Sequence, residues 1–251
     1  HFPDRQPQSA RGARRSPFHE RLVAQRAHFR DVSGWECPGW YAPEGQQPDE
    51  GPLTYGRPQW FQLWEAEPHA CREDVIAMDM SFMGKFLVQG RDAGAFLDYL
   101  SANEVNGDSE KITYTQWLND DGLLEADLTV IKLDNEKFMV VTSDVAHRHT
   151  ETWMKRHIGV DQHVFVTDVT SGYGQLNIQG PRSRELLQSI TSADLSNEAF
   201  PFRTAREIDM GLGRVLCVRI TYAGELGYEL NIPSEQALHV YDRIVQAGAP
   251  F

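Results

Sequence analysis

Two short stretches place carboxylates where a β-strand is expected. In "GLLEADLTV", Glu125 and Asp127 open a largely apolar strand, and in "GELGYEL" Glu225 and Glu229 belong to another. Carboxylates are depleted in strands relative to β-branched residues, so packing or function must offset each placement. A carboxylate held there can accept a proton or stabilise a passing cation. Alternatively, these acids protect an edge strand from aggregation, and the spacing alone leaves both interpretations open.

The spacing of the first two acids makes a geometric prediction. Residues two apart in an extended strand point to the same side, so Glu125 and Asp127 are expected to share one face of a sheet. The sequence "NDDG", residues 119–122, predicts the tight turn that folds the strand over 111–118 back onto the strand carrying these acids.

From Val75 onwards the pattern of apolar residues becomes regular. The predicted elements are strands over 85–90, 111–118, 136–142, 163–170 and 173–180, helices over 91–100, 143–159 and 181–190, a hairpin over 214–233 closed near 223–225, and a final helix over 234–248. Ser143 or Asp144 is expected to cap the helix that stops at Gly159. Because the strands meander with helices between them, we predict an α+β fold with antiparallel or mixed sheets and interspersed helices.

The first 74 residues have a different character. Ser16 is expected to cap a short helix with Pro17 at its first position. Residues 34–58 combine glycines and prolines with several aromatics, which favours a loop with its own side-chain packing. The chain starts at His1 without a methionine and stops soon after the last helical pattern, so we expect a fragment of a longer protein.

Composition removes several function classes. The 251 residues include 24 basic and 36 acidic ones, and the net charge of -12 argues against a nucleic-acid or membrane partner. No apolar run approaches the roughly 18 residues of a membrane span, and no secretory signal is visible. Cys37, Cys71 and Cys217 form no CxxC pair, so neither zinc nor a disulfide framework is predicted. A reducing compartment, the cytoplasm or the mitochondrial matrix, fits best.

Other motifs carry weaker signals. His147 and His149 are interpreted as plain surface histidines, because residues two apart on a helix point to different sides and cannot share a metal. The stretch "YGQLNIQG" before "PRSRELL" could hold an anion at a helix start, although a structural turn is the preferred interpretation. The patterns GxGxxG after a strand, GxxxxGK[ST] and GxSxG do not occur, so nucleotide binding by those routes is not predicted.

Four stretches in order carry a family resemblance: "MDMSFMGKFLVQGRDAGAFLDYL", "YTQWLNDDGLLEADLTV", "LNIQGPRSRELL" and "ITYAGELGYELNIP". Together they resemble the glycine-cleavage T-protein (aminomethyltransferase) family of folate-binding domains. The earlier "SPFHERL" and "GWECPGWYAP" resemble the segment that joins the flavin and folate halves of sarcosine and dimethylglycine dehydrogenases. The resemblance implies a joining segment over 1–74 and a T-protein-like folate-binding domain over 75–251, truncated at its C-terminus.

The resemblance also implies roles for individual residues. Asp127 matches the family acid that approaches the folate nitrogens and is the catalytic candidate, while the acid that precedes it in the family is replaced by Ala126. Glu229 or Glu225 would hold the pterin, with Glu229 preferred. Tyr114 in "YTQWL" and Tyr228 resemble residues that line the folate cavity, although a tyrosine on a strand is equally compatible with the core. The implied cofactor is tetrahydrofolate, and FAD is implied only through a flavin domain in cis or as a partner.

Three hypotheses of function follow from the resemblance. The first is folate-dependent one-carbon transfer, which traps the carbon released from sarcosine or dimethylglycine as 5,10-methylenetetrahydrofolate and predicts that Asp127 faces an open cavity. The second is a regulatory module without catalysis, which predicts a filled cavity or an ion-paired Asp127. The third is a flavin-independent folate methyltransferase or demethylase. The small amine substrate, the compartment and the oligomeric state stay open.

Overall fold

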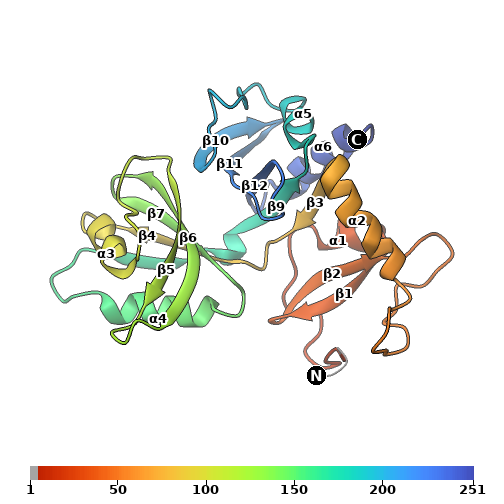
Figure 1. Ribbon diagram of the computed structural model, residues 1–251, viewed down its shortest axis with the longest axis horizontal. Coiled ribbons are helices and arrows are strands. Elements are labelled where there is room, and N and C mark those ends of the chain that lie inside the picture. Colours follow the sequence, from red (N-terminus) through yellow and green to blue (C-terminus); the bar gives the residue numbers. More distant parts are fainter. Residues whose placement is uncertain (1–4) are drawn as a thin grey trace.

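The computed structural model describes residues 5–251, which form three β-sheets with helices packed around them (Figure 1). The elements in chain order are α1 His19–Ala24, β1 Ala27–Val32, β2 Trp35–Tyr41, α2 Phe61–Glu73, β3 Ile76–Asp79, β4 Gly84–Gln89, α3 Ala93–Leu100, β5 Ile112–Leu118, β6 Leu124–Asp134, β7 Lys137–Thr142, α4 His147–His157, β8 Phe165–Asp168, the 3-10 turn η1 Thr170–Gly172, β9 Tyr173–Gln179, α5 Ser183–Gln188, β10 Thr204–Met210, β11 Gly213–Arg219, β12 Gly227–Pro233 and α6 Ala237–Gly248.

The first large sheet has the strand order β5-β6-β7-β4-β8, and every neighbouring pair is antiparallel. The predicted turn at 119–122 joins β5 to β6, and Gly122 adopts the positive φ of 74° that favours glycine there. One face of the sheet packs against α3 and α4 through a core that includes Phe96, Leu97 and Met154. This unit lies at one end of the molecule (Figure 1).

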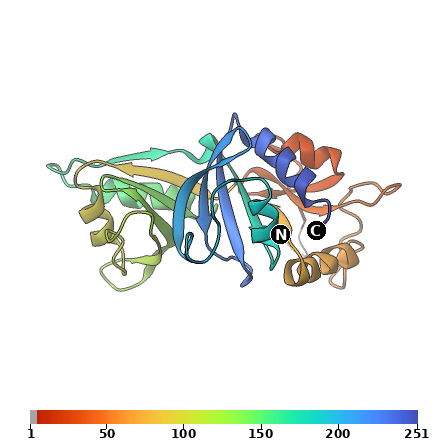
Figure 2. The same ribbon diagram turned by 90° about the horizontal axis from the view of Figure 1, so that it is seen from above.

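The second large sheet has the order β10-β11-β12-β9-β3 and is also antiparallel throughout. The chain contributes β3 before it builds the first sheet and returns to pair β9 with β3 afterwards, so the two sheets are interlocked in sequence. Seen from above, the second sheet stands between the first sheet and the N-terminal part (Figure 2). The prediction of an α+β fold with antiparallel sheets is confirmed.

The N-terminal residues contribute to the core of the second sheet. Phe18 and Leu22 of the α1 region are buried there, beside residues of α5 and α6. Arg21 of α1 forms an ion pair with Asp242 of α6 at 2.8 Å, and Phe18 stacks on Tyr241 with ring centroids 5.4 Å apart. These contacts fix α1 against the last helix, as Figure 2 shows.

The prediction of a loop over 34–58 is wrong in its first part, because residues 35–41 form β2 and pair with β1. The sequence suggested a loop because Pro38 cannot donate a ladder hydrogen bond. The two-stranded sheet accommodates it as an edge strand, where the register shifts between His28 and Phe29, beside the Pro38 pairing. Helix α2, which contains Pro68, was not predicted either.

The predicted helix caps are also corrected. Helix α1 begins at His19 after Phe18, so Ser16 lies in the preceding turn, where its Oγ accepts a hydrogen bond from the Phe18 N–H at 3.3 Å. Helix α4 begins at His147 after Ala146, and no side chain caps it. Local sequence therefore located these helices but missed their first residues by a few positions.

Candidate functional site

The two large sheets meet through an apolar seam. On the first sheet Ile131 and Val141 belong to it, and on the second Leu216 and Val218 do. We call the two sheet surfaces that contain these residues the inner faces. Because side chains alternate along a strand, the position of any residue relative to this seam follows from its register.

Asp127 lies on the inner face of β6, four residues before Ile131, and is exposed. Its cross-strand partner is Gln116, whose Nε2 donates a hydrogen bond to Asp127 Oδ1 at 3.1 Å. Tyr114, also on β5, is 53% exposed. Its phenol is hydrogen-bonded to Asp127, and this bond is the main reason that the pKa of Tyr114 is raised. Asp127 and Tyr114 are thus brought together, as a carboxylate and a phenol open to solvent.

Glu125 does not share the environment of Asp127, so the prediction of a common face is wrong. The strand pairing passes from Trp117 with Ala126 to Leu118 with Leu124, which leaves Glu125 as the extra residue of a bulge. The Glu125 carboxylate is bound at 2.7 Å by His149 Nε2 of α4 and at 2.9 Å by Asn119 Nδ2. One of the two acids is therefore held by its neighbours, while the other stays accessible.

Glu229 lies on the inner face of the second sheet, where it pairs with Val218 of the seam. Its carboxylate accepts hydrogen bonds from Asn177 Nδ2 at 3.0 Å and from Gln175 Nε2 at 3.4 Å. Burial raises the pKa of Glu229, and the Asn177 hydrogen bond and the Lys85 ammonium oppose that shift. Within 5–251, the side chains that donate hydrogen bonds to this carboxylate are both amides.

Tyr228 and Glu225 occupy different places from Glu229. Tyr228 is fully buried in the core on the opposite face of β12, where its hydroxyl donates to the Leu195 carbonyl at 3.3 Å. Glu225 lies in the loop before β12 and forms an ion pair with Arg72 of α2. The two glutamates differ in their ion pairing. Glu225 is paired with the Arg72 guanidinium, and Glu229 has no ion-pair partner within 5–251.

Sequence reasoning missed the amide side chains around Glu229. Gln175, Asn177 and Gln179 stand at every second position of β9 and are almost fully buried. Buried polar atoms usually have a hydrogen-bond partner, but Gln175 Oε1 and Gln179 Nε2 have none within 5–251, and neither has Asn231 Oδ1. The alternation of amides with apolar residues in "GQLNIQ" was the signal that could have revealed a polar inner face.

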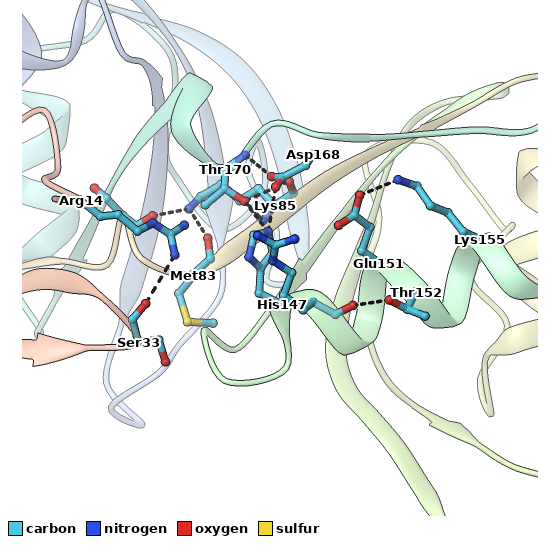
Figure 3. A network of polar contacts seen from close by, with 12 residues as sticks. Arg14, Ser33, Met83, Lys85, His147, Glu151, Thr152, Lys155, Asp168 and Thr170 are labelled. Atoms are coloured by element: carbon cyan, nitrogen blue, oxygen red, sulfur yellow. Dashed lines mark hydrogen bonds and ion pairs between the residues drawn. The ribbon is translucent and has the colours of Figure 1, made fainter. Parts of the chain in front are cut away.

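The interpretation of His147 as a plain surface histidine is wrong. The His147 side chain is only 12% exposed, and its Nε2 lies 3.0 Å from Asp168 Oδ2 and 3.3 Å from Thr170 Oγ1. Burial favours a higher pKa for Asp168, but the hydrogen bonds from Thr170 and the nearby His147 outweigh it and lower the pKa. Figure 3 shows this group beside Lys85.

Two sizeable cavities lie near the inner faces. One of ≈ 490 Å³ is formed by β2, α2 and β3, and Cys37, Tyr41 and Asp79 are among its lining residues. Another of ≈ 440 Å³ lies between the large sheets, with Tyr173 and Asn231 in its wall. Neither is lined by Asp127, which stands on open surface rather than in a closed pocket.

Residues 5–251 offer neither a cluster of metal ligands nor a membrane-spanning helix. In that range no three His, Cys, Asp or Glu side chains are grouped so that they could hold a metal ion. No helix in the same range is both long and apolar enough to cross a bilayer. The three cysteines are buried and unpaired.

Several curated proteins resemble this chain. The 4-methylaminobutanoate oxidase (formaldehyde-forming) of Paenarthrobacter nicotinovorans is 35% identical over 99% of this chain and 30% of its own length. Mouse mitochondrial sarcosine dehydrogenase is 32% identical over 99% of this chain and 31% of its own length. The mouse mitochondrial pyruvate dehydrogenase phosphatase regulatory subunit is 30% identical over 97% of this chain and 28% of its own length. The chain spans under a third of these relatives.

The fold has a counterpart among solved structures. The glycine cleavage system aminomethyltransferase T of Bartonella henselae superposes with a TM-score of 0.75 at 20% identity, over 92% of this chain and 57% of that one. The family model described as the GCVT N-terminal domain matches residues 18–251. The chain therefore belongs to the GCVT N-terminal domain family, with sarcosine dehydrogenase and aminomethyltransferase among its relatives.

Proposed function

We propose that this chain is the folate-dependent part of an enzyme that oxidises an N-methyl amino acid such as sarcosine or dimethylglycine. The carbon released in that oxidation is captured as 5,10-methylenetetrahydrofolate. The observation that carries the proposal is the pair of carboxylates on the inner faces of the two sheets. Asp127 is accessible and without an ion-pair partner within 5–251, and Glu229 is partly buried among amides. The regulatory-module hypothesis predicted a filled cavity or an ion-paired Asp127, and Asp127 has no ion pair within 5–251. The transfer hypothesis predicted an open cavity in front of Asp127, whereas Asp127 lies on open surface outside the two cavities described above.

Glu229 suits the recognition of a pterin. A pterin presents an amino group and a ring N–H side by side, and one ionised carboxylate can accept from both. The unpartnered oxygens Gln175 Oε1 and Asn231 Oδ1 add buried acceptors on the same inner face. The residues present therefore fit a ligand rich in N–H donors, and tetrahydrofolate, when bound, would supply the amine nitrogens that take up the carbon.

Asp127 suits the chemical step. The carboxylate is open to solvent and held in direction by Gln116, so it can accept an N–H proton from the attacking amine and stabilise the iminium cation. Tyr114 keeps its phenol protonated to high pH because its pKa is raised by Asp127, so it acts as a hydrogen-bond donor and orients the carboxylate. A positioned general base of this kind contributes about 100-fold to 10,000-fold in rate.

The remaining parts of the proposal concern the rest of the enzyme. Residues 1–74 would join this folate-binding part, residues 75–251, to a flavin-containing part or partner that oxidises a small amine such as sarcosine or dimethylglycine. FAD would bind there and not to this chain. The three free cysteines suit a reducing compartment such as the cytoplasm or the mitochondrial matrix.

An anaerobic calorimetric titration with tetrahydrofolate tests the proposal. Micromolar binding by the protein, weakened in Glu229→Gln and unchanged in Glu225→Gln, is the expected result. A protein that binds no tetrahydrofolate at any concentration up to the millimolar range would favour the regulatory module instead.

A further inference from the structure

Lys85 is a buried cation that the proposed chemistry does not use. It lies on the inner face of β4 opposite Val141 and has no exposed surface. Its Nζ donates hydrogen bonds to the carbonyl oxygens of Met83 at 2.8 Å and Ser81 at 3.2 Å, and Figure 3 shows the first of these. Both acceptors are uncharged, and no carboxylate within 5–251 forms a direct ion pair with this ammonium. Lysine is almost never fully buried unless it is paired, so its placement calls for an explanation.

Three carboxylates from three different strands act on Lys85 through their charge: Asp79 of β3, Asp168 of β8 and Glu229 of β12. Burial lowers the pKa of Lys85 to about 7, and these three acids oppose the shift. His147 of α4 is a further titratable group here, and it is bound to Asp168. The charge of Asp79 also acts on the Cys37 thiol and on the phenols of Tyr41 and Tyr241.

Two of these acids have strong partners of their own. Asp79 accepts hydrogen bonds from the hydroxyls of Ser16 and Ser81, at 2.5 Å and 2.6 Å. Asp168 accepts a hydrogen bond from the Thr170 N–H at 2.9 Å, in addition to its contact with His147. Neither depends on Lys85 alone for its charge.

Glu229 is different, because its direct partners are the neutral amides of Asn177 and Gln175, and the second contact is long at 3.4 Å. Lys85 is the cation that lowers its pKa against the effect of burial. The two groups are also linked through the backbone, since the Gln175 N–H donates to Ser81 Oγ at 3.0 Å and Lys85 holds the Ser81 carbonyl.

We propose that Lys85 is a positioning residue for Glu229, whose carboxylate it keeps ionised so that both oxygens can accept the paired N–H groups of a pterin. An ionised carboxylate has about four acceptor positions, and the two amides occupy two of them. A protonated Glu229 would present an O–H donor toward the ligand's own donors. The inference rests on the proposed function, because it assigns Lys85 a role only if Glu229 binds a pterin.

The sign of the pH effect follows from the two titrations. Below about pH 7 the Lys85 ammonium is charged, and its charge then opposes the burial that raises the pKa of Glu229. Above it, Lys85 loses its proton, but the high pH itself keeps Glu229 ionised. Wild-type affinity for a pterin should therefore change little between pH 5.5 and 8.5. Without the ammonium, the pKa of Glu229 rises further and affinity is lost as the pH falls.

The test is an anaerobic calorimetric titration with tetrahydrofolate from pH 5.5 to 8.5. Lys85→Gln keeps an N–H donor for the carbonyls but removes the charge, and Lys85→Arg keeps the charge. Losing a neighbouring opposite charge shifts a carboxyl pKa by roughly 1–3 units. We expect Lys85→Gln to bind about tenfold more weakly than wild type at pH 6 and equally well at pH 8.5, and Lys85→Arg to follow the wild-type profile. Lys85→Met is a second neutral variant if Lys85→Gln does not fold.

A double variant separates this role from a structural one. In Glu229→Gln the affinity should be independent of pH, and adding Lys85→Gln should have no further effect. The inference would be overturned, and the proposed function left intact, by either of two results. Lys85→Gln could bind tetrahydrofolate more weakly by the same factor at every pH, or its affinity could follow the wild-type pH profile. If wild type binds tetrahydrofolate but Glu229→Gln binds as tightly, the assignment of the pterin to Glu229 is overturned, and the role of Lys85 with it.

Discussion

Replacing Asp127 by asparagine isolates the charge of one carboxylate from its shape. Gln116 donates a hydrogen bond of 3.1 Å to Asp127. Asparagine keeps an oxygen that can accept this bond but cannot take up a proton. Because Asp127 is exposed and has no ion-pair partner within 5–251, the free energy of unfolding should change by no more than about 0.5 kcal/mol. The transfer step should lose about 100-fold in rate, which corresponds to ~2.7 kcal/mol in the barrier.

The assay follows the fate of the carbon. Sarcosine or dimethylglycine is oxidised by the attached or an added flavin dehydrogenase, and 5,10-methylenetetrahydrofolate and free formaldehyde are measured together. An added formaldehyde-oxidising enzyme converts free formaldehyde as it forms, so that its product measures the formaldehyde and the spontaneous condensation with tetrahydrofolate is suppressed. In Asp127→Asn, amine oxidation should continue at its normal rate while the carbon appears as formaldehyde, and the Kd for tetrahydrofolate should change less than about threefold, since the lost interaction belongs to the transition state.

The matched control is Glu125→Gln, two residues away in the same strand. Its carboxylate is engaged by His149 and Asn119 and should contribute nothing to transfer. The reasoning is refuted if Asp127→Asn transfers carbon within threefold of wild type, or if Glu125→Gln is equally impaired. The second result would point to the integrity of the hairpin rather than to the chemistry of Asp127.

Four further predictions distinguish residues of the site from residues of the scaffold. Tyr114→Phe should weaken transfer by several-fold and leave Kd nearly constant; an unaltered rate would remove Tyr114 from the site. In Asp127→Asn the pKa of Tyr114 should fall toward its ordinary value in an ultraviolet titration, because its hydrogen bond to Asp127 is the main cause of the raised pKa. Glu229→Gln should raise the thermal midpoint at pH 7, since burial raises the pKa of this carboxyl and the stability it contributes is lost as the pH rises above the unfolded value. Tyr228→Ala should cost about 3–5 kcal/mol in denaturant unfolding, as for other buried aromatics, with normal tetrahydrofolate affinity in the folded fraction.

The sequence predicted much of the architecture correctly because the relevant signals are local. The turn at 119–122 and the alternation of apolar residues located the β5 and β6 hairpin, and the predicted hairpin over 214–233 is the β11 and β12 pair. The sequence-based prediction failed for β2. Pro38 is unfavourable in a strand, and β2 forms because it pairs with β1. Local preference is overridden there by a pairing between two segments.

The candidate site was predicted in part, for a similar reason. The positions of Asp127, Tyr114 and Glu229 on strands follow from sequence, and their roles stay predictions. The sequence could not show which of Tyr228 and Glu229 faces the core. The register of β12 against β9 and β11 places Tyr228 in the core and Glu229 on the inner face beside the seam.

By itself the sequence determined most of the elements from β4 onwards, their order and the family, since short-range patterns and motifs encode these. The tertiary structure alone decided which acid is free. A single extra residue in β6 turns Glu125 to His149 and leaves Asp127 open. The tertiary structure also decided that Lys85, an ordinary strand residue in the sequence, is fully buried between two sheets. Charge states depend on burial and on neighbours far away along the chain, and only the folded arrangement of the strands supplies both.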